Sequence, residues 1–294
     1  MFGVSVSPDG EQIAFVKMRN GGASGSDIFL KPVGAKSQTQ KTTHTGWDAF
    51  PEISPDGTKL AFASNRNGSW DIFVTNTGSG RAKRQVTTSF EDEIAPTWSK
   101  DSKKIAFSKF STSANQWEIW IYELDTGALT SLVPGLFPDY SPKEDLLAFQ
   151  RASAGSRHDA IWTIDERGTV ETEIISSADE SFINPTWSPD GERLVFAAGG
   201  SRQSSVKVGR TASRRASRSS SKRPSSQTTE ALVSFKGFDI WTVDVDGTNL
   251  NQLTSNEGQD WNPDWSSDGR IYFSSSRVDG GANIWSVIPE FVDF

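Results

Sequence analysis

The sequence predicts an all-β protein, a β-propeller of six blades that each contain four antiparallel strands. Three observations carry this prediction. A hairpin motif recurs six times along the 294 residues, an alternating apolar strand follows each copy, and a weaker fourth strand ends most copies. Units of about 40 to 45 residues with four antiparallel strands are typical of propeller blades.

The hairpin motif has a Ser-Pro-Asp-Gly turn between two short strands. Proline presets φ at the second turn position, the aspartate side chain bonds nearby backbone groups, and glycine accepts a positive φ. The turn serines are Ser7, Ser54, Ser99, Ser141, Ser188 and Ser266. They are 47, 45, 42, 47 and 78 residues apart, and the last interval becomes 42 when a 36-residue insert is set aside. The turns at 99–102 and 141–145 lack the glycine, so we expect them to open or twist differently.

The strands after each turn have aromatic residues at fixed positions. The second strand carries Phe15, Phe62, Phe107, Phe149, Phe196 or Phe273. Alternating β-branched and aromatic residues predict third strands that start at 27, 71, 118, 160, 239 and 283, and weaker fourth strands start at 84, 128, 172 and 251. Seven tryptophans recur at two further fixed positions and are predicted to pack between adjacent blades, namely Trp98, Trp187, Trp265, Trp120, Trp162, Trp241 and Trp285.

The repeat resembles the TolB-like, PD40-type propeller repeat, and the copy PEISPDGTKLAFASNRNGSWDIF that starts at Pro51 follows that pattern most closely. The resemblance covers the chain apart from the insert and implies a single propeller domain over 1–294. It implies less about function, because related propellers include the periplasmic TolB interaction domain, the propellers of tricorn-like and prolyl-oligopeptidase-type peptidases, and oligosaccharide lyases.

The last blade is expected to be incomplete. Leu253 follows Ile240 by 13 residues in the fifth blade, whereas ten residues follow Ile284 in the sixth. Met1 stands almost inside the first strand of the first blade, so no preceding strand completes the last one. A fragment, a shortened gene product and a ring that closes imperfectly all fit this pattern, because a ring needs such a closure to cover its edges.

The insert at 201–236 is predicted to be a disordered, basic, Ser/Arg-rich loop between the second and third strands of blade 5. It has nine basic residues and one acidic residue, so it carries +8 and leaves −15 on the rest of the chain. Arg214-Arg215-Ala216-Ser217 fits a basophilic kinase consensus, and we expect phosphorylation at Ser217 and the neighbouring Ser213. A passive spacer and a contact with nucleic acid or anionic lipid are the alternatives.

The sequence contains few residues or motifs that indicate an enzyme. We therefore expect no catalytic residues and favour a protein that is not an enzyme. The chain has no cysteine and only two histidines, His44 and His158, which are far apart and expected to be ordinary loop residues. It has no G-x-S-x-G elbow, H-E-x-x-H or phosphate-binding glycine motif. No apolar run predicts a membrane span and no signal peptide is present, so the chain as given is expected in the cytoplasm, or in the periplasm or outside the cell if its N-terminus is truncated.

Acidic residues recur where each blade connects to the next. Asp48, Glu93 and Asp260 each stand three residues before the proline of the following strand. Asp92, Asp179 and Glu180 lie close to the same connections, and Trp47 and Trp261 adjoin two of the acids. In a propeller these connections gather around one mouth of the channel. We therefore expect a non-enzymatic scaffold that binds a protein or peptide, of cationic character, over this acidic face.

Several alternatives remain open for the same residues. The acids can cap turns and keep the face soluble, or hold Ca²⁺, although no D-x-D-x-D-G spacing supports a cation and no cofactor is otherwise expected. Trp47 and Trp261 can stack on a glycan in a carbohydrate-binding or lyase propeller. The chain can also be the substrate-gating part of a larger peptidase. Arg66 and Arg277, at a repeated position, are expected to bond carbonyls or the aspartate of a neighbouring repeat rather than a ligand.

Overall fold

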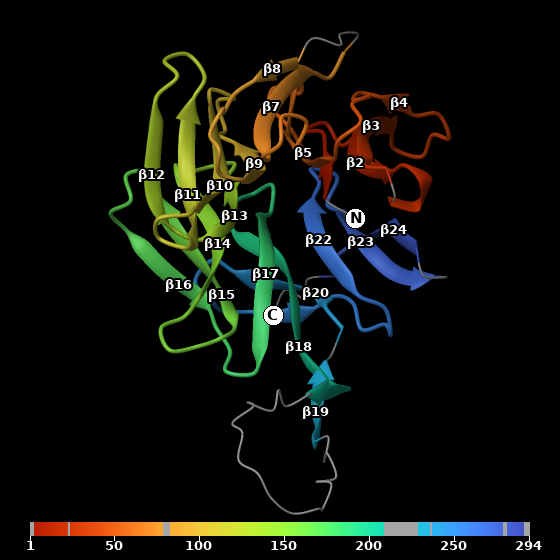
Figure 1. Ribbon diagram of the computed structural model, residues 1–294, viewed down its shortest axis with the longest axis vertical. Coiled ribbons are helices and arrows are strands. Elements are labelled where there is room, and N and C mark those ends of the chain that lie inside the picture. Colours follow the sequence, from red (N-terminus) through yellow and green to blue (C-terminus); the bar gives the residue numbers. More distant parts are fainter. Residues whose placement is uncertain are drawn as a thin grey trace, which may run out of the picture.

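The computed structural model describes residues 3–22, 24–78, 83–208, 229–235, 237–278 and 281–290. These residues form six antiparallel sheets that follow one another along the chain and surround a central axis, so that the first sheet lies beside the last (Figure 1). The helical content of the described residues is one 3₁₀ turn at Asn20–Gly22. The all-β six-bladed propeller predicted from the repeat is thus confirmed.

The blades have the strand order expected of a propeller, with the first strand innermost. Blade 1 contains β1 (Val4–Val6), β2 (Gln12–Met18), β3 (Ser26–Pro32) and β4 (Thr39–Gln40). Blade 2 contains β5 (Asp48–Ile53), β6 (Lys59–Ser64), β7 (Asp71–Asn76) and β8 (Lys83–Gln85). Blade 3 contains β9 (Glu93–Trp98), β10 (Lys104–Ser111), β11 (Gln116–Glu123) and β12 (Leu129–Pro134). Blade 4 contains β13 (Leu136–Tyr140), β14 (Leu146–Ala152), β15 (Asp159–Asp165) and β16 (Glu171–Ile175).

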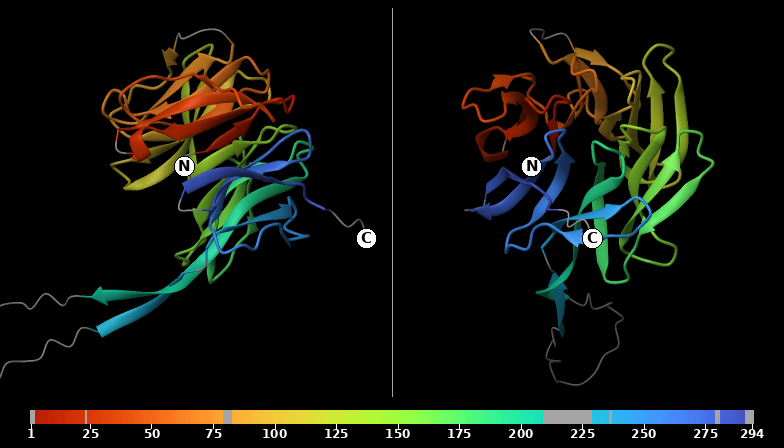
Figure 2. Two further views of the ribbon diagram at one scale, coloured as in Figure 1. Left: turned by 90° about the vertical axis from the view of Figure 1, so that its right-hand side faces the viewer. Right: turned by 180° about the vertical axis from the view of Figure 1, so that it is seen from behind.

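The last two blades depart from this plan. Blade 5 contains β17 (Glu180–Trp187), β18 (Arg193–Val208), β20 (Asp239–Asp244) and β21 (Asn251–Gln252). β18 runs past the sheet and pairs with β19 (Thr229–Phe235), and this pair projects away from the blades (Figure 2). Blade 6 has three strands, β22 (Asp260–Trp265), β23 (Ile271–Val278) and β24 (Gly281–Val287), as expected for an incomplete last blade.

The disorder expected of the insert remains a prediction. The structure gives strands at both ends of the insert, in the extended β18 and in β19. Residues 209–228, which include the kinase-consensus serines Ser213 and Ser217, lie outside the described residues.

Each of the five innermost strands after the first contains a β-bulge at an x-Pro pair. The residue before the proline has a positive φ in Phe50 (50°), Ala95 (52°), Phe137 (53°), Asn184 (53°) and Asn262 (49°). The register with the second strand shifts at the same place. Proline fits here because the innermost strand is a sheet edge that needs no N–H donor. The bulge turns the two residues that follow the proline toward the channel or the core.

The fixed phenylalanine position forms the core between blades. Phe62, Phe107, Phe149, Phe196 and Phe273 are all at most 1% exposed. Phe15 is only half-buried, and its cluster at the seam between blades 6 and 1 is the smallest of the six. Among the tryptophans predicted for the core, Trp98 and Trp187 are buried, but Trp285 is 38% exposed, so that prediction is wrong for Trp285.

The two turns without glycine close in spite of the expectation that they would open. Ser102 takes the glycine position of the turn at 99–102 with a φ of 59°, and its N–H donates to Ser99 O across 2.8 Å, as Gly57 N–H does to Ser54 O. In the turn at 141–145, Ser141 N–H still donates to Leu146 O across 2.8 Å. Backbone hydrogen bonds therefore close both turns, and the hydroxyls of Ser99 and Ser141 also accept the N–H groups of Lys104 and Glu144.

Candidate functional site

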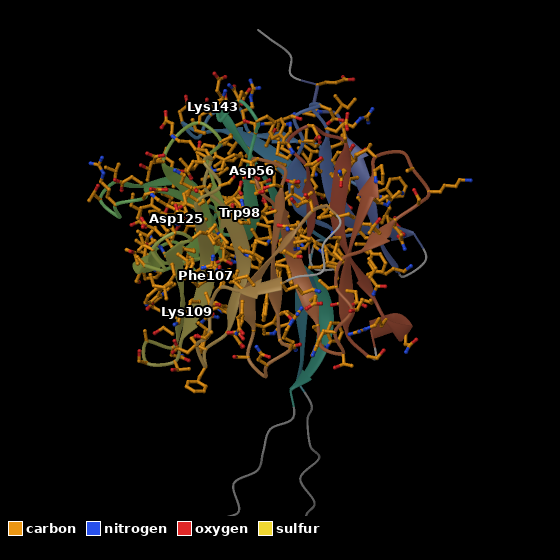
Figure 3. The ribbon with its side chains drawn as sticks, turned by 90° about the horizontal axis from the view of Figure 1, so that it is seen from above. Asp56, Trp98, Phe107, Lys109, Asp125 and Lys143 are labelled. Atoms are coloured by element: carbon orange, nitrogen blue, oxygen red, sulfur yellow. The ribbon has the colours of Figure 1, made fainter. Side chains whose placement is uncertain are left out.

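The antiparallel order of the strands sorts the loops onto two ends of the propeller. One end, called here the connection face, has the links from each blade to the next and the hairpin tips between second and third strands. The opposite end, called the turn face, has the Ser-Pro-Asp-Gly turns and the links between third and fourth strands. In Figure 3 the turn-face residues Asp56 and Lys143 lie toward one end and Lys109 toward the other, with Phe107 between them.

Two of the predicted acids on the connection face are buried and paired with arginine. Asp48 and Asp260 are both 0% exposed. Arg66 Nη2 donates to Asp48 Oδ1 across 2.9 Å, and Arg277 Nη2 donates to Asp260 Oδ2 across 2.7 Å. Each arginine also donates from Nε to the serine two residues earlier and stacks on an aromatic ring of the third strand. Arg66 and Arg277 thus bond an aspartate, as expected, but the aspartate belongs to the same blade and not to a neighbouring repeat.

The third buried acid, Glu93, pairs with lysine. Glu93 is 2% exposed, and Lys109 Nζ lies 3.5 Å from its Oε1 while stacking on the ring of Trp120. Its neighbour Asp92 is exposed, and Asp92 Oδ1 accepts the N–H of Trp70 across 3.0 Å. Burial, reinforced by the charges of Glu93 and Asp92, raises the pKa of the nearby Asp71 to about 6.

The other predicted partner-binding residues lie in or next to three different links between blades. Asp179 is exposed and Glu180 half-buried at the start of blade 5. Trp47 is half-buried in the link to blade 2, and its N–H donates to Asn65 Oδ1 across 2.7 Å. Trp261 packs against the core cluster between blades 5 and 6. The structure thus groups the predicted residues by blade and not into one continuous ring.

A fully exposed aromatic residue stands beside two of the acids, and the sequence analysis missed it. Phe90, in the link from blade 2 to blade 3, is 102% exposed. The loop around it is firmly held, because Ser89 Oγ donates to Glu93 Oε1 across 2.7 Å, Phe110 N–H donates to Asp92 O across 2.9 Å, and Thr112 N–H donates to Glu91 Oε1 across 2.8 Å. The sequence did carry a signal for this residue. Phe90 is an apolar residue in the polar link SFEDE, and it does not occupy any of the repeated apolar positions.

Three carboxyl groups inside the channel were also missed. Glu52, Asp139 and Asp264 directly follow the bulge prolines of blades 2, 4 and 6, and the same position holds Thr97 in blade 3 and Thr186 in blade 5. Carboxyl and hydroxyl side chains therefore alternate around the channel. Thr97 Oγ1 donates to Asp139 Oδ1 across 3.0 Å, and Asp264 Oδ2 accepts the N–H of Val6 across 2.6 Å. These contacts join neighbouring blades at the axis.

Burial raises the pKa values of the three channel carboxyl groups. The pKa of Asp139 rises to about 6, mainly through desolvation. The pKa of Asp264 rises to about 7, through desolvation and the charge of Asp139. Desolvation and the charges of Asp264 and Asp139 raise the pKa of Glu52 as well. The three groups repel one another when ionised, so the channel favours their protonated forms.

The channel itself is narrow. The cavity on the axis has a volume of about 80 Å³ and is lined by the bulges, including Phe50, Phe137, Glu52 and Asp139. The rings of Phe50 and Phe137 lie 5.7 Å apart. A space of this size holds a few water molecules but not a peptide or a sugar ring.

Two further observations concern metals and membranes. In the part of the chain that the structure describes, no three His, Cys, Asp or Glu side chains are placed to hold a metal ion. Within the same part, no helix has the length and apolarity needed to cross a membrane.

The comparison with known proteins agrees with this architecture. The family model of the TolB β-propeller domain, PD40, matches residues 2–175. An uncharacterized protein of Agrobacterium fabrum is 49% identical over 51 residues, which are 17% of this chain and 17% of that protein. The match therefore spans less than a fifth of the length of that relative.

Solved structures share the fold at low sequence identity. A structure assigned to TolB from Agrobacterium tumefaciens is 19% identical, with a TM-score of 0.68 over 99% of this chain and 90% of that one. Oligogalacturonate lyase of Vibrio parahaemolyticus is 13% identical, with a TM-score of 0.59 over 98% and 89%. The propeller domain of the Trilobed protease of Pyrococcus furiosus, described as having an open velcro topology, is 15% identical, with a TM-score of 0.54 over 96% and 77%.

Proposed function

The chain belongs to the TolB β-propeller (PD40) family, and from this premise we propose that it is a non-enzymatic interaction scaffold that binds a cationic segment of a protein over its connection face. The observation that carries the proposal is Phe90, a fully exposed aromatic side chain on a rigid loop between acidic residues. Exposed aromatic residues on rigid loops are the usual anchors of protein interfaces.

Charge around Phe90 favours a basic partner. Glu91 and Asp92 follow Phe90 directly, and the buried Glu93 and Asp71 lie beneath the loop. Among the described residues, Lys109 pairs with two of these carboxylates, and its Nζ lies 3.5 Å from both Glu91 and Glu93. Burial is the main cause that raises the pKa of Asp71, and the charges of Glu93 and Asp92 raise it further. A lysine or arginine next to an apolar side chain would complement this surface.

The narrow channel gives no support to a function in which substrate passes along the axis. Phe50, Phe137, Glu52 and Asp139 line a cavity of only about 80 Å³ on the axis, and the two rings lie 5.7 Å apart. Binding over the outer surface of the connection face needs no such passage. The proposal for this chain therefore rests on the face and not on the channel.

The proposal is tested by selection of peptides on the whole chain. A random peptide library displayed on phage is selected on the protein, and enriched peptides are measured by fluorescence polarisation. We expect enriched peptides to combine Lys or Arg with an apolar residue. Phe90→Ala should weaken their binding by more than about tenfold and Asp92→Asn by a smaller factor, because an aromatic anchor outweighs a rim charge.

The matched control lies on the turn face. Leu250, in the link between the third and fourth strands of blade 5, is 47% exposed, and Leu250→Ala should leave binding unchanged. Phe90→Ala should also leave the thermal midpoint unchanged, since the ring makes no buried contact. Selected peptides that lack basic residues, or that bind Phe90→Ala and the unaltered chain equally, would refute the proposal.

A further inference from the structure

β24 has an outer edge that the described residues leave uncovered, whereas β4, β8, β12, β16 and β21 cover the same edge in the other blades. Ile284 of β24 occupies the repeat position of Ile28, Ile72 and Ile240. The backbone C=O and N–H groups of these three isoleucines point toward the outer edge of the sheet. Each carbonyl accepts the backbone N–H of a residue in the outer segment, namely Lys41, Val86 or Leu253, across 2.8 Å. The backbone N–H of each isoleucine donates to the hydroxyl of Thr42, Thr87 or Thr254 across 2.9 Å.

Because the described residues provide no fourth strand to blade 6, an apolar groove lies open at the seam between blades 6 and 1. At four other seams an apolar residue in or directly after the fourth strand packs against the next blade, and these residues are Val86, Leu132, Ile174 and Leu253. At the seam from blade 6 to blade 1, a groove of about 900 Å³ lies there instead. Phe15, Tyr272, Ile284 and Trp285 border it, and Trp285 is the tryptophan that the sequence wrongly placed in the core. Figure 1 shows β24 at this seam, beside the strands of blade 1.

The rim of the groove is basic although the body of the protein is acidic. Lys17, Lys31 and Lys36 all line the groove, and no acidic residue lines it. Among the described residues no carboxylate lies within 4 Å of these three ammonium groups, in contrast to Lys59, Lys104 and Lys109 elsewhere. The groove therefore attracts negative charge.

We propose that this edge and groove bind an extended segment of a partner protein that carries acidic side chains and adds a fourth strand to blade 6. An apolar residue of the segment would donate its N–H to the carbonyl of Ile284 and fill the groove. A following threonine would accept the N–H of Ile284, as Thr87 and Thr254 do in their blades. Acidic residues beside this pair would meet the three lysines. Strand addition to an exposed sheet edge is an established mode of peptide recognition.

The charge of the groove also favours one of the segments that could bind along β24. The basic insert of this chain would be repelled by the lysines. A second copy that paired through its own β24 would bring no carboxylate, since residues 281–287 contain no acidic side chain. A partner segment with acidic residues satisfies both the edge and the rim.

The binding test uses a synthetic peptide of defined sequence with the whole chain. The probe is the fluorescein-labelled nonapeptide Asp-Leu-Asp-Gln-Leu-Thr-Ser-Asn-Glu, which is the outer-strand segment 249–257 with N249D and N251D. Two control peptides replace either the leucine before threonine by proline, which removes the N–H donor, or both aspartates by lysine. We expect the probe to bind by fluorescence polarisation, and each control to bind at least tenfold more weakly.

Variants of the protein separate the edge from the rim. Ser286 is two residues from Ile284 on the same edge, so Ser286→Pro removes an outward N–H and should weaken the probe at least tenfold, while Ser286→Thr should not. The combined variant Lys17→Glu, Lys31→Glu and Lys36→Glu should lose the probe and gain the lysine peptide, and this reversal shows that the variant is folded. Lys103→Glu on the turn face is the matched charge control.

Hydrogen exchange supplies an independent measurement of the edge. The amides of Ile284 and Ser286 should exchange rapidly in the free chain and slow at least tenfold with the probe, while the amides of β6 should not change. Three results would overturn the proposal. The first is equal binding of the probe and the proline peptide. The second is slow exchange of the Ile284 amide in the free chain, which would mean that a segment of the same chain covers the edge. The third is a dimer of this chain that the Ser286→Pro substitution dissociates.

Discussion

Arg66 donates a 2.9 Å hydrogen bond to Asp48, a carboxylate with no exposed surface. The pair joins the start of the innermost strand of blade 2 to the end of its second strand, and the guanidinium stacks 4.4 Å from the ring centre of Phe73 in the third. One arginine thus ties three strands together at the connection face. Arg277 repeats the arrangement with Asp260 in blade 6. Asp48 and Asp260, which the sequence placed among the partner-binding residues, therefore each pair with an arginine of their own blade.

Arg66→Ala should lower the free energy of unfolding by about 3–5 kcal/mol, because it leaves the charge of Asp48 buried without a partner. Urea titration followed by tryptophan fluorescence measures the change. The double variant Arg66→Met with Asp48→Asn should recover part of the loss, since it removes both charges. Arg270→Ala breaks the exposed pair with Asp268 at 3.7 Å and should change stability by less than about 1 kcal/mol. Equal effects of Arg66→Ala and Arg270→Ala would contradict this account.

The channel carboxyl groups predict that the free energy of unfolding falls as the pH rises from about 4 to about 7. Their pKa values are raised in the folded chain, to about 6 for Asp139 and about 7 for Asp264, and are near 4 when unfolded. The folded chain therefore holds more protons between these values, and the contribution of these groups is complete below about pH 4 and lost as pH rises through 6 to 7. The lowered pKa values of Asp9, Asp101 and Asp190 in the turns act in the opposite sense, but at lower pH.

Glu52→Gln removes one of the three repelling charges and should flatten this dependence. The fall in unfolding free energy from pH 5 to pH 8 should shrink by roughly 1–2 kcal/mol relative to the unaltered chain. Urea titrations at both pH values provide the measurement. Glu144→Gln, at an exposed turn position, is the control and should leave the slope as it is. A slope that Glu52→Gln does not change would show that the three groups do not interact.

In the hairpin turn of blade 2, glycine is required for its backbone conformation and not for lack of space. Gly57 has a φ of +70° and no atom within 4 Å of an added Cβ. Gly57→Ala should therefore cost about 1–2 kcal/mol through the left-handed conformation alone. Gly78 is equally free of neighbours and has no left-handed φ, so Gly78→Ala should be close to neutral. Chemical denaturation compares the two, and an equal cost would contradict the argument.

Repetition made the fold predictable, because six copies of one hairpin fix the strands, the turns and the Phe positions together. Features that occur in one blade only could not be predicted from the repeat. Phe90 belongs to no repeat position, and its exposure depends on how Ser89 and Glu93 hold the loop. Whether an acid such as Asp48 is buried or free depends on a partner 18 residues away. The alternating channel side chains at Glu52, Asp139 and Asp264 could have been found by aligning the residue after each bulge proline.

The open seam between blades 6 and 1 predicts that replacing the repeated phenylalanine by alanine has a different effect on the free energy of unfolding in different blades. Phe107 is 0% exposed between blades 2 and 3, and Phe107→Ala should cost about 3–5 kcal/mol, as expected for a buried aromatic residue that leaves a cavity. Phe15 occupies the same position in blade 1 but is half-buried and borders the groove beside β24. Phe15→Ala should therefore cost only about 1–2 kcal/mol, since part of its ring is already in water. Urea titration of both variants at pH 7 tests the difference, and a cost for Phe15→Ala as large as that for Phe107→Ala would mean that this seam is closed in solution.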